Sequence, residues 1–175
     1  LECTLNYAFL LTCETPCTPC VVTCPAGSVP ENEDCGEDTN GGCDSTPEVF
    51  EDIACGQTKC GWTWADAGRR DTDWYKLTTT AAQRFIPAVD TEVPLALLLI
   101  TGTTQGQPRC NDLAGWSITD IEQCNGGAEV SGLPQFPAGE YWFVIVPADA
   151  AGEPIWYNYP CGGGLNRYWL RVRCQ

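Results

Sequence analysis

Cysteine dominates the chemistry that the side chains of this sequence could perform. The 175 residues include 13 cysteines but no histidine and no methionine. Thiols in such number are typical of exported domains cross-linked by disulfides, because reducing cytosols keep few such bonds. The absence of histidine removes the usual general base, proton shuttle and metal ligand. Because 13 is odd, at least one cysteine is either free or paired to another molecule.

Four cysteines in the body of the chain suggest two local disulfides, each of which would close a loop. We expect Cys35 to pair with Cys43, and Cys110 to pair with Cys124, although spacing alone does not settle connectivity. The missing methionine predicts that Leu1 follows a removed signal peptide, and so a secreted protein of the extracellular space or cell surface.

A second group of cysteines is closely spaced near the N-terminus. Thiolates at such spacing can converge on a zinc ion or an iron–sulfur cluster, but the abundance of other cysteines favours disulfides. The group consists of Cys13, Cys17, Cys20 and Cys24.

An acidic, turn-rich loop offers oxygen ligands for calcium. Calcium binds several oxygens on a turning backbone, and glycines are interspersed among the acidic residues here. The loop lacks the spacing of an EF-hand, and the alternative is a plain solvated acidic loop. The candidate ligands are Asp34, Glu37, Asp38, Asn40 and Asp44. Asp71 and Asp73 stand at a predicted strand start, where turn capping is favoured over metal binding or acid–base work.

Several aromatic residues lie in turn-rich segments rather than at regular core positions. Exposed flat rings could stack on carbohydrate or on another protein, whereas buried ones would close the ends of the fold. The candidates are Trp62, Trp64, Trp116 and Trp156, together with Tyr157 and Tyr159.

The first segment has the alternation of an extended strand. Successive strand side chains point to opposite faces, so residues 1–14 form one apolar and one mostly polar face. The apolar face consists of Leu1, Cys3, Leu5, Tyr7, Phe9, Leu11 and Cys13. A proline- and cysteine-rich connector over residues 15–30 follows, and is predicted to be semi-rigid.

The rest of the chain, residues 31–175, is predicted to be one all-β domain that begins with an acidic loop over residues 31–52. Short strands alternate with turn signals, and we find no convincing helix. Strands are expected at Trp74–Thr80, Leu95–Thr101 and Gly139–Val146, and around Tyr168, Leu170 and Val172 near the C-terminus.

The charge of the chain excludes some classes of partner. The formal net charge is −14 and the pI is about 4.1. Nucleic acids and anionic lipids are bound by clustered Lys and Arg, so neither is an expected partner. No apolar run is long enough to cross a membrane as a helix, so membrane insertion is not expected either.

Three motifs resemble those of the bacterial pre-peptidase C-terminal domain family, in its cysteine-rich secreted variety. They are Arg70-Asp71-Thr72-Asp73-Trp74-Tyr75, Ala138-Gly139-Glu140-Tyr141 and the terminal Tyr168-Trp169-Leu170-Arg171-Val172, and the run Pro30-Glu31-Asn32-Glu33 is similar as well. The resemblance covers roughly residues 24–174. It implies an antiparallel β-sandwich with jelly-roll character, exported and without catalytic activity.

Three functions remain open from the sequence. The first is a structural subunit of an extracellular fibre or surface assembly, a homopolymer in which the strand of residues 1–14 completes the sheet of the next molecule. The odd cysteine would then suit an inter-subunit disulfide, with Cys3 or Cys13 best placed. The second is a carbohydrate-binding or accessory module. The third, an enzyme, is the least expected because no histidine is available.

Overall fold

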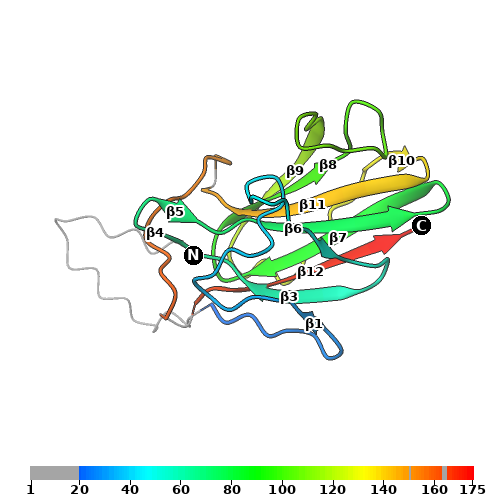
Figure 1. Cartoon of the computed structure of the whole chain (residues 1–175). Coiled ribbons are helices and arrows are strands. Elements are labelled where there is room, and N and C mark those ends of the chain that lie inside the picture. The colour runs from blue at the N-terminus through cyan, green and yellow to red at the C-terminus, as the bar shows by residue number, and fades with distance from the viewer. Residues whose placement is uncertain (1–19, 150, 163–164) are drawn as a thin grey trace.

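The computed structural model of the chain describes residues 20–149, 151–162 and 165–175. Two five-stranded sheets face each other as a sandwich (Figure 1). The first has the order β1 (Val29–Pro30), β3 (Thr58–Trp62), β12 (Arg167–Cys174), β7 (Gln83–Thr91) and β10 (Gln135–Phe136). The second has the order β2 (Glu51–Asp52), β6 (Asp73–Thr79), β11 (Gly139–Pro147), β8 (Leu95–Ile100) and β9 (Gly115–Ile121). A small hairpin of β4 (Ala65–Asp66) and β5 (Arg69–Arg70) lies apart from both.

Strand pairing is antiparallel except at two short edge strands. β1 pairs in parallel with β3, and β2 pairs in parallel with β6. The central strand of each sheet has the longest ladders: Phe143 of β11 lies opposite Tyr75 and Leu99, and Leu170 of β12 lies opposite Lys59 and Val89. The predicted all-β sandwich is therefore confirmed, with twelve strands among the described residues and no helix.

The core lies between the inner faces of the two sheets. Alternation along each strand sends every second side chain inward, so β11 contributes Tyr141, Phe143 and Ile145, and β12 contributes Tyr168, Leu170 and Val172. Phe85 packs against Phe136 at a ring-centroid distance of 5.3 Å. These inward and outward positions match those expected from the sequence.

The outer face of the second sheet is also covered. Its outward residues Trp74, Trp142 and Val144 form a second apolar cluster with Ile100 and Val146. The loops that precede β2 and β9 are joined over this face by the disulfide Cys43–Cys110. This cover explains why β8 is buried on both faces, as its nearly continuous apolar sequence predicts.

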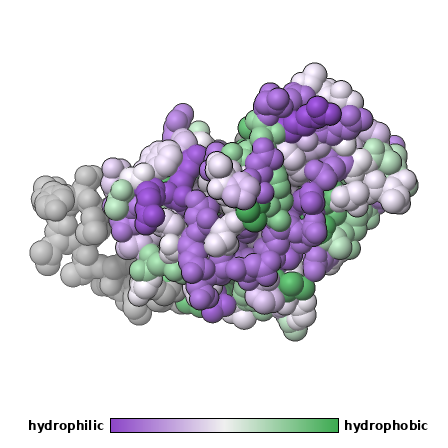
Figure 2. Space-filling view, viewed as in Figure 1, coloured by the Kyte–Doolittle hydropathy of each residue, from purple (hydrophilic) through white to green (hydrophobic). Residues whose placement is uncertain are grey.

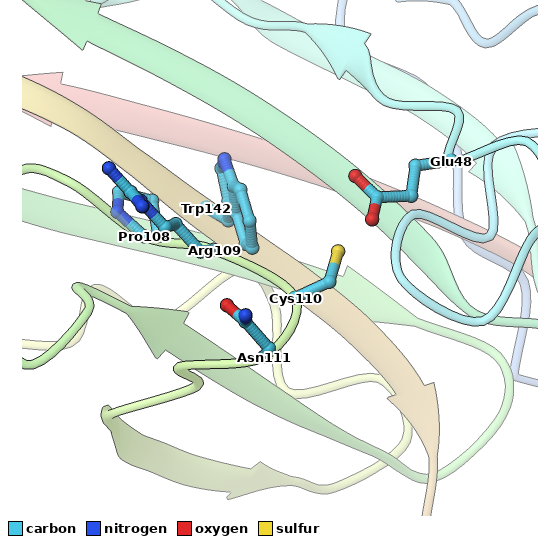
Figure 3. Close-up of a pocket in the computed structure, with 6 residues that line it drawn as sticks. All are labelled: Glu48, Pro108, Arg109, Cys110, Asn111 and Trp142. Atoms are coloured by element: carbon cyan, nitrogen blue, oxygen red, sulfur yellow. The ribbon is translucent and has the colours of Figure 1, made fainter.

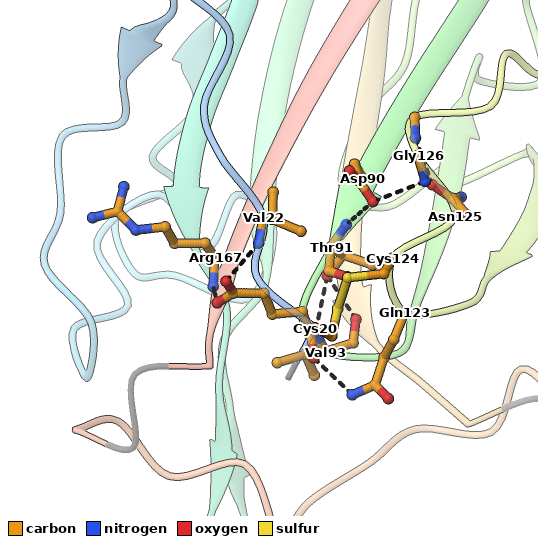
Figure 4. The surroundings of a disulfide bond; sticks show 12 residues. Cys20, Val22, Asp90, Thr91, Val93, Gln123, Cys124, Asn125, Gly126 and Arg167 are labelled. Atoms are coloured by element: carbon orange, nitrogen blue, oxygen red, sulfur yellow. Dashed lines mark hydrogen bonds between the residues drawn. A yellow bond between two sulfur atoms is a disulfide. The ribbon is translucent and has the colours of Figure 1, made fainter. Parts of the chain in front are cut away.

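Residues 20–24 are fixed against the outer face of the first sheet. The disulfides Cys20–Cys124 and Cys24–Cys60 hold the two ends of this segment. Between them Val22 is buried against Trp169, and its N–H donates to Glu92 Oε1 over 2.7 Å. The same carboxylate accepts the Arg167 N–H at 2.8 Å, so segment and sheet are tied through one side chain (Figure 4).

The surface agrees with the acidic composition. The face seen in Figure 2 is mostly hydrophilic, and its hydrophobic side chains lie in small separate groups. Among the described residues, no helix is long and apolar enough to cross a membrane. The predicted assembly strand over residues 1–14, and the connector as far as residue 19, lie outside the described residues.

Candidate functional site

Four carboxyl side chains come together inside the sandwich. Glu31 and Glu33 follow β1 of the first sheet, whereas Asp71 precedes β6 of the second sheet and Asp73 begins it. Their exposed fractions are 8%, 7%, 1% and 0% respectively. We call these four residues the carboxylate cluster. It forms because two acidic motifs, distant in sequence, are brought together where the two sheets meet.

Glu31 is held by donors from both sheets. Its Oε2 accepts hydrogen bonds from the hydroxyls of Tyr168 at 2.9 Å and Tyr75 at 3.2 Å, and its Oε1 accepts the N–H of Trp62. The carboxylate lies directly over Gly61, where a side-chain carbon would collide with it. The absence of a side chain at position 61 therefore makes room for this carboxylate.

Glu33 is held by a single turn of the acidic loop. Its Oε2 accepts the N–H and hydroxyl of Thr39, at 2.5 and 2.6 Å, and the N–H of Asn40 at 3.2 Å. Its other oxygen, Oε1, has no hydrogen-bond partner, and neither end of the buried Asn40 amide has one.

The aspartates leave further oxygens without partners. Both carboxyl oxygens of Asp73, and Oδ1 of Asp71, are buried and receive no hydrogen bond from an N–H group or a hydroxyl. Their neighbours are carboxyl groups, since Asp73 lies within hydrogen-bonding reach of Glu31 and Asp71 within reach of Glu33. One oxygen each from Glu31, Glu33 and Asp73 lie within 4.8 Å of one another. Buried polar groups are almost always satisfied, so this set requires an explanation.

The cluster is unfavourable when all its members are charged and no cation is present. Burial raises the pKa of Glu31 to about 7, against the hydrogen bonds from its neighbours. Burial, and then repulsion from Glu33 and Glu31, raises the pKa of Asp71 to about 10. Burial, and then repulsion from Asp71 and Glu31, raises the pKa of the fully buried Asp73 well above its usual range. Glu31, Asp71 and Asp73 must therefore either hold protons or share a positive ion.

The donor set fits a hard divalent cation. Calcium takes six to eight oxygen ligands at about 2.3–2.6 Å, so two of its ligands lie at most about 5 Å apart, which the 4.8 Å grouping satisfies. Carboxylate oxygens from Glu31, Glu33 and Asp73 meet this spacing. The described residues contribute no thiolate to this set, so calcium fits it better than zinc.

The acidic loop predicted as a calcium site has a different arrangement. Glu37 accepts the N–H of Asp34 at 3.2 Å, which is a local turn contact. Asp34, Glu37, Asp38 and Asp44 are exposed and form no metal-like group among the described residues. Asn40 adjoins the carboxylate cluster through its N–H bond to Glu33. Asp38 lies near the cluster as well, since burial and then repulsion from Glu33 raise its pKa. The loop instead positions Glu33, by donating its backbone N–H groups.

The sequence did not predict this site, although Glu31 and Glu33 on one segment and Asp71 and Asp73 on another each belong to a motif that it contains. Asp71 and Asp73 were assigned to turn capping, but their side chains are buried and do not cap a turn. Glu31 and Glu33 stood out only through a family resemblance. The available signal was the pair of motifs Glu-x-Glu and Asp-x-Asp beside strands, and only the fold brings them together.

The disulfides join distant segments rather than neighbouring cysteines. All four candidate cysteines form disulfides, but the expected local pairs Cys35–Cys43 and Cys110–Cys124 do not occur. Ten cysteines form the five bonds Cys20–Cys124, Cys24–Cys60, Cys35–Cys161, Cys43–Cys110 and Cys55–Cys174. Since Cys20 and Cys24 pair elsewhere, the four-cysteine metal site near the N-terminus does not form.

The candidate tryptophans lie in different environments. Trp64 is buried and donates its ring N–H to Glu37 O over 2.8 Å. Trp62 is half-buried beneath the guanidinium of Arg167, at 4.3 Å. Trp156 is 43% exposed. Trp116 belongs to β9, and its side chain is outside the described part of the structure.

A shallow hollow of about 510 Å³ lies beside the Cys43–Cys110 bond. It is lined by Glu48, Pro108, Arg109, Cys110, Asn111 and Trp142 (Figure 3). It contains none of the predicted site residues except Cys110, and none of the carboxylate cluster.

Fold and site together define a disulfide-stapled β-sandwich with a buried acidic centre. No family model matches the chain, and no curated protein does. Among solved structures it is similar to the pre-peptidase C-terminal domain of a collagenase from Bacillus anthracis, the family that its motifs resemble. The identity is 19%, with 73% of this chain and 97% of that chain covered, and the TM-score is 0.41.

Proposed function

We propose that this chain is a secreted, non-catalytic β-sandwich module that is braced by calcium in the carboxylate cluster. The observation that supports this most strongly is Asp73, which is fully buried with both carboxyl oxygens unpartnered among other carboxyls. A cation that joins Glu31 to Asp73 would tie the segment after β1 to the start of β6, and so one sheet to the other. Five disulfides suit an oxidising, extracellular setting.

Thermal unfolding with excess calcium, compared with unfolding in a chelator, tests this role. A ligand that binds the folded state alone stabilises it by about 2.7 kcal/mol at 100 times its Kd. We expect a calcium-dependent rise in Tm, and a smaller one with magnesium, which demands a more regular octahedral site. An equal Tm in calcium and chelator would rule out the bracing role.

We further propose that the module is a structural subunit, polymerised head-to-tail by exchange of the strand over residues 1–14. Two features of the described residues support this. β9 is the last strand of its sheet and pairs only with β8. Cys20, where the described chain begins, is bonded to Cys124, three residues beyond the end of β9. The described chain therefore begins at the loop that follows β9, and an edge strand such as β9 is where a further strand can be added.

The cysteine count supports a covalent link between subunits. Thirteen cysteines less the ten in the five disulfides leaves Cys3, Cys13 and Cys17. Three thiols cannot all pair with one another, so one is available to a second molecule.

Negative-stain electron microscopy of the oxidised protein, with and without residues 1–14, tests assembly. Fibres that disappear on truncation are the expected result. Dispersed monomers from both forms would contradict strand exchange and leave the calcium-braced module unaffected.

A further inference from the structure

The β4–β5 hairpin and the segment around residues 154–159 form a rigid ribbon at one end of the sandwich (Figure 1). Ala65 and Tyr159 exchange backbone hydrogen bonds at 3.0 and 3.1 Å, and the Gly68 N–H donates to Trp156 O over 3.2 Å. The hairpin turn has positive φ at both Ala67 and Gly68, the backbone form that fits tight hairpins. These hydrogen bonds hold the backbone of the segment around Trp156 against the hairpin.

Two aromatic residues of the ribbon that are adjacent in sequence both have exposed side chains. Trp156 is 43% exposed and Tyr157 is 57% exposed. The Arg70 guanidinium lies 4.5 Å from the centre of the Trp156 ring, covers one of its faces and holds the ring in place. We call Trp156 and Tyr157 the aromatic patch.

We propose that the aromatic patch binds a neutral, hydroxyl-rich oligosaccharide, an activity separate from calcium binding and assembly. A sugar ring has an apolar C–H face that stacks on flat aromatic rings, and hydroxyl groups that hydrogen-bond at its rim. The Arg70 guanidinium, which covers one face of the Trp156 ring, offers N–H donors to those hydroxyls at the edge of the ring.

Size and charge exclude two other kinds of occupant. An aromatic side chain buries about 150–250 Å² when fully covered, so the exposed parts of these two rings amount to roughly 200 Å². A stable protein interface needs about 800 Å² on each partner. A polyanionic ligand would be repelled by a chain of net charge −14. A small neutral ligand fits the patch best.

Two of the other candidate tryptophans are less accessible to a sugar than Trp156. Trp64 is buried with its ring N–H already donated to Glu37, and Trp62 is half-buried under Arg167. Rigid presentation reduces the entropy that binding must overcome, which favours stacking at Trp156.

NMR of the tryptophan indole N–H groups tests the proposal. The probes are oligosaccharides of β-1,4-linked glucose, xylose and N-acetylglucosamine, added to the oxidised protein in calcium. We expect the Trp156 signal, assigned with W156F, to shift saturably with at least one probe. W156A and Y157A should each weaken that binding about tenfold, and W62A should leave it unchanged.

Two results would overturn the proposal. One is a Trp156 signal unmoved by all three probes, and the other is binding that persists equally in folded W156A and Y157A. Both side chains are exposed, so circular dichroism of each variant establishes that it folds. Neither result bears on the response to calcium, which is measured separately by unfolding.

Discussion

The hydroxyl of Tyr168 donates a hydrogen bond to Glu31 Oε2 over 2.9 Å, and so connects the central strand of the first sheet to the carboxylate cluster. Tyr168 is fully buried and lies in the same apolar core as Tyr75, which donates to the same oxygen. The position of Glu31 is therefore set by the core of the fold and does not depend on a bound ion.

Tyr168→Phe should destabilise the protein by about 1–2 kcal/mol, because it removes a donor from a buried carboxylate. Urea unfolding of the oxidised protein measures this change. Tyr157→Phe is the matched control, since that ring is exposed and its loss of a hydroxyl should cost little. Equal effects of the two substitutions would contradict the structural role of the Tyr168 hydroxyl.

Asp73→Asn should have opposite effects with and without calcium. Without calcium, burial and repulsion from Asp71 and Glu31 favour the protonated form of Asp73, and a neutral Asn replaces that acid without needing a proton, so the variant should be at least as stable as the parent. With calcium it removes a ligand, so the rise in Tm should be lost. Asp66→Asn, at an exposed position on β4, should keep the full calcium effect. A calcium response that survives Asp73→Asn would place the ion elsewhere.

Stability should fall as pH rises when calcium is absent. The pKa of Glu31 is raised from 4.5 to about 7 in the folded chain, so its contribution is complete below pH 4.5 and is lost as pH rises through about 7. The loss is at most about 3 kcal/mol by linkage. Calcium competes with these protons, so its stabilising effect should be larger at about pH 8 than at about pH 5.

Unfolding curves across this pH range, in calcium and in chelator, measure both trends. A metal-free protein that gains stability between about pH 5 and about pH 8 would show that the cluster is not desolvated as the structure indicates.

The strands were predictable from sequence because their patterns are local. Tyr141, Phe143 and Ile145 alternate with Trp142, Val144 and Val146, and each set occupies a separate apolar cluster. Disulfide pairing was not predictable, since Cys35 bonds to Cys161, which is 126 residues away. Nothing in local spacing distinguishes that partner from Cys43.

The carboxylate cluster was not predictable for a related reason. Asp71 before a strand has the sequence signature of a turn cap, and acidic loops are usually solvated. Its burial depends on the two sheets closing over it, and its neighbour Glu33 belongs to the segment after β1. Whether such acidic residues are solvated or buried together therefore depends on long-range packing, which the local sequence does not reveal.

The buried ion pair between Lys59 and Glu51 offers a test of how the sheet edges are joined. Lys59 Nζ of β3 lies 2.5 Å from Glu51 Oε1 of β2, and both side chains are almost completely buried. Lys59→Met should cost about 3–5 kcal/mol because it leaves Glu51 buried and uncompensated, and adding Glu51→Leu should restore most of that loss.

Lys76→Met is the control for this pair. Lys76 lies 3.5 Å from the largely exposed Asp52, so breaking that contact should cost about 0–1 kcal/mol. Chemical unfolding of these three variants and the parent gives the comparison. If the double variant is no more stable than Lys59→Met alone, the cost of the single change does not come from an unpaired Glu51.

Native mass spectrometry of the oxidised protein, prepared in calcium and exchanged into a volatile buffer, most directly tests the calcium-braced module. The structure predicts a species that retains calcium in the parent chain and in Asp66→Asn, and the loss of that species in Asp73→Asn. A parent chain that retains no calcium, or an Asp73→Asn variant that retains as much as the parent, would contradict it.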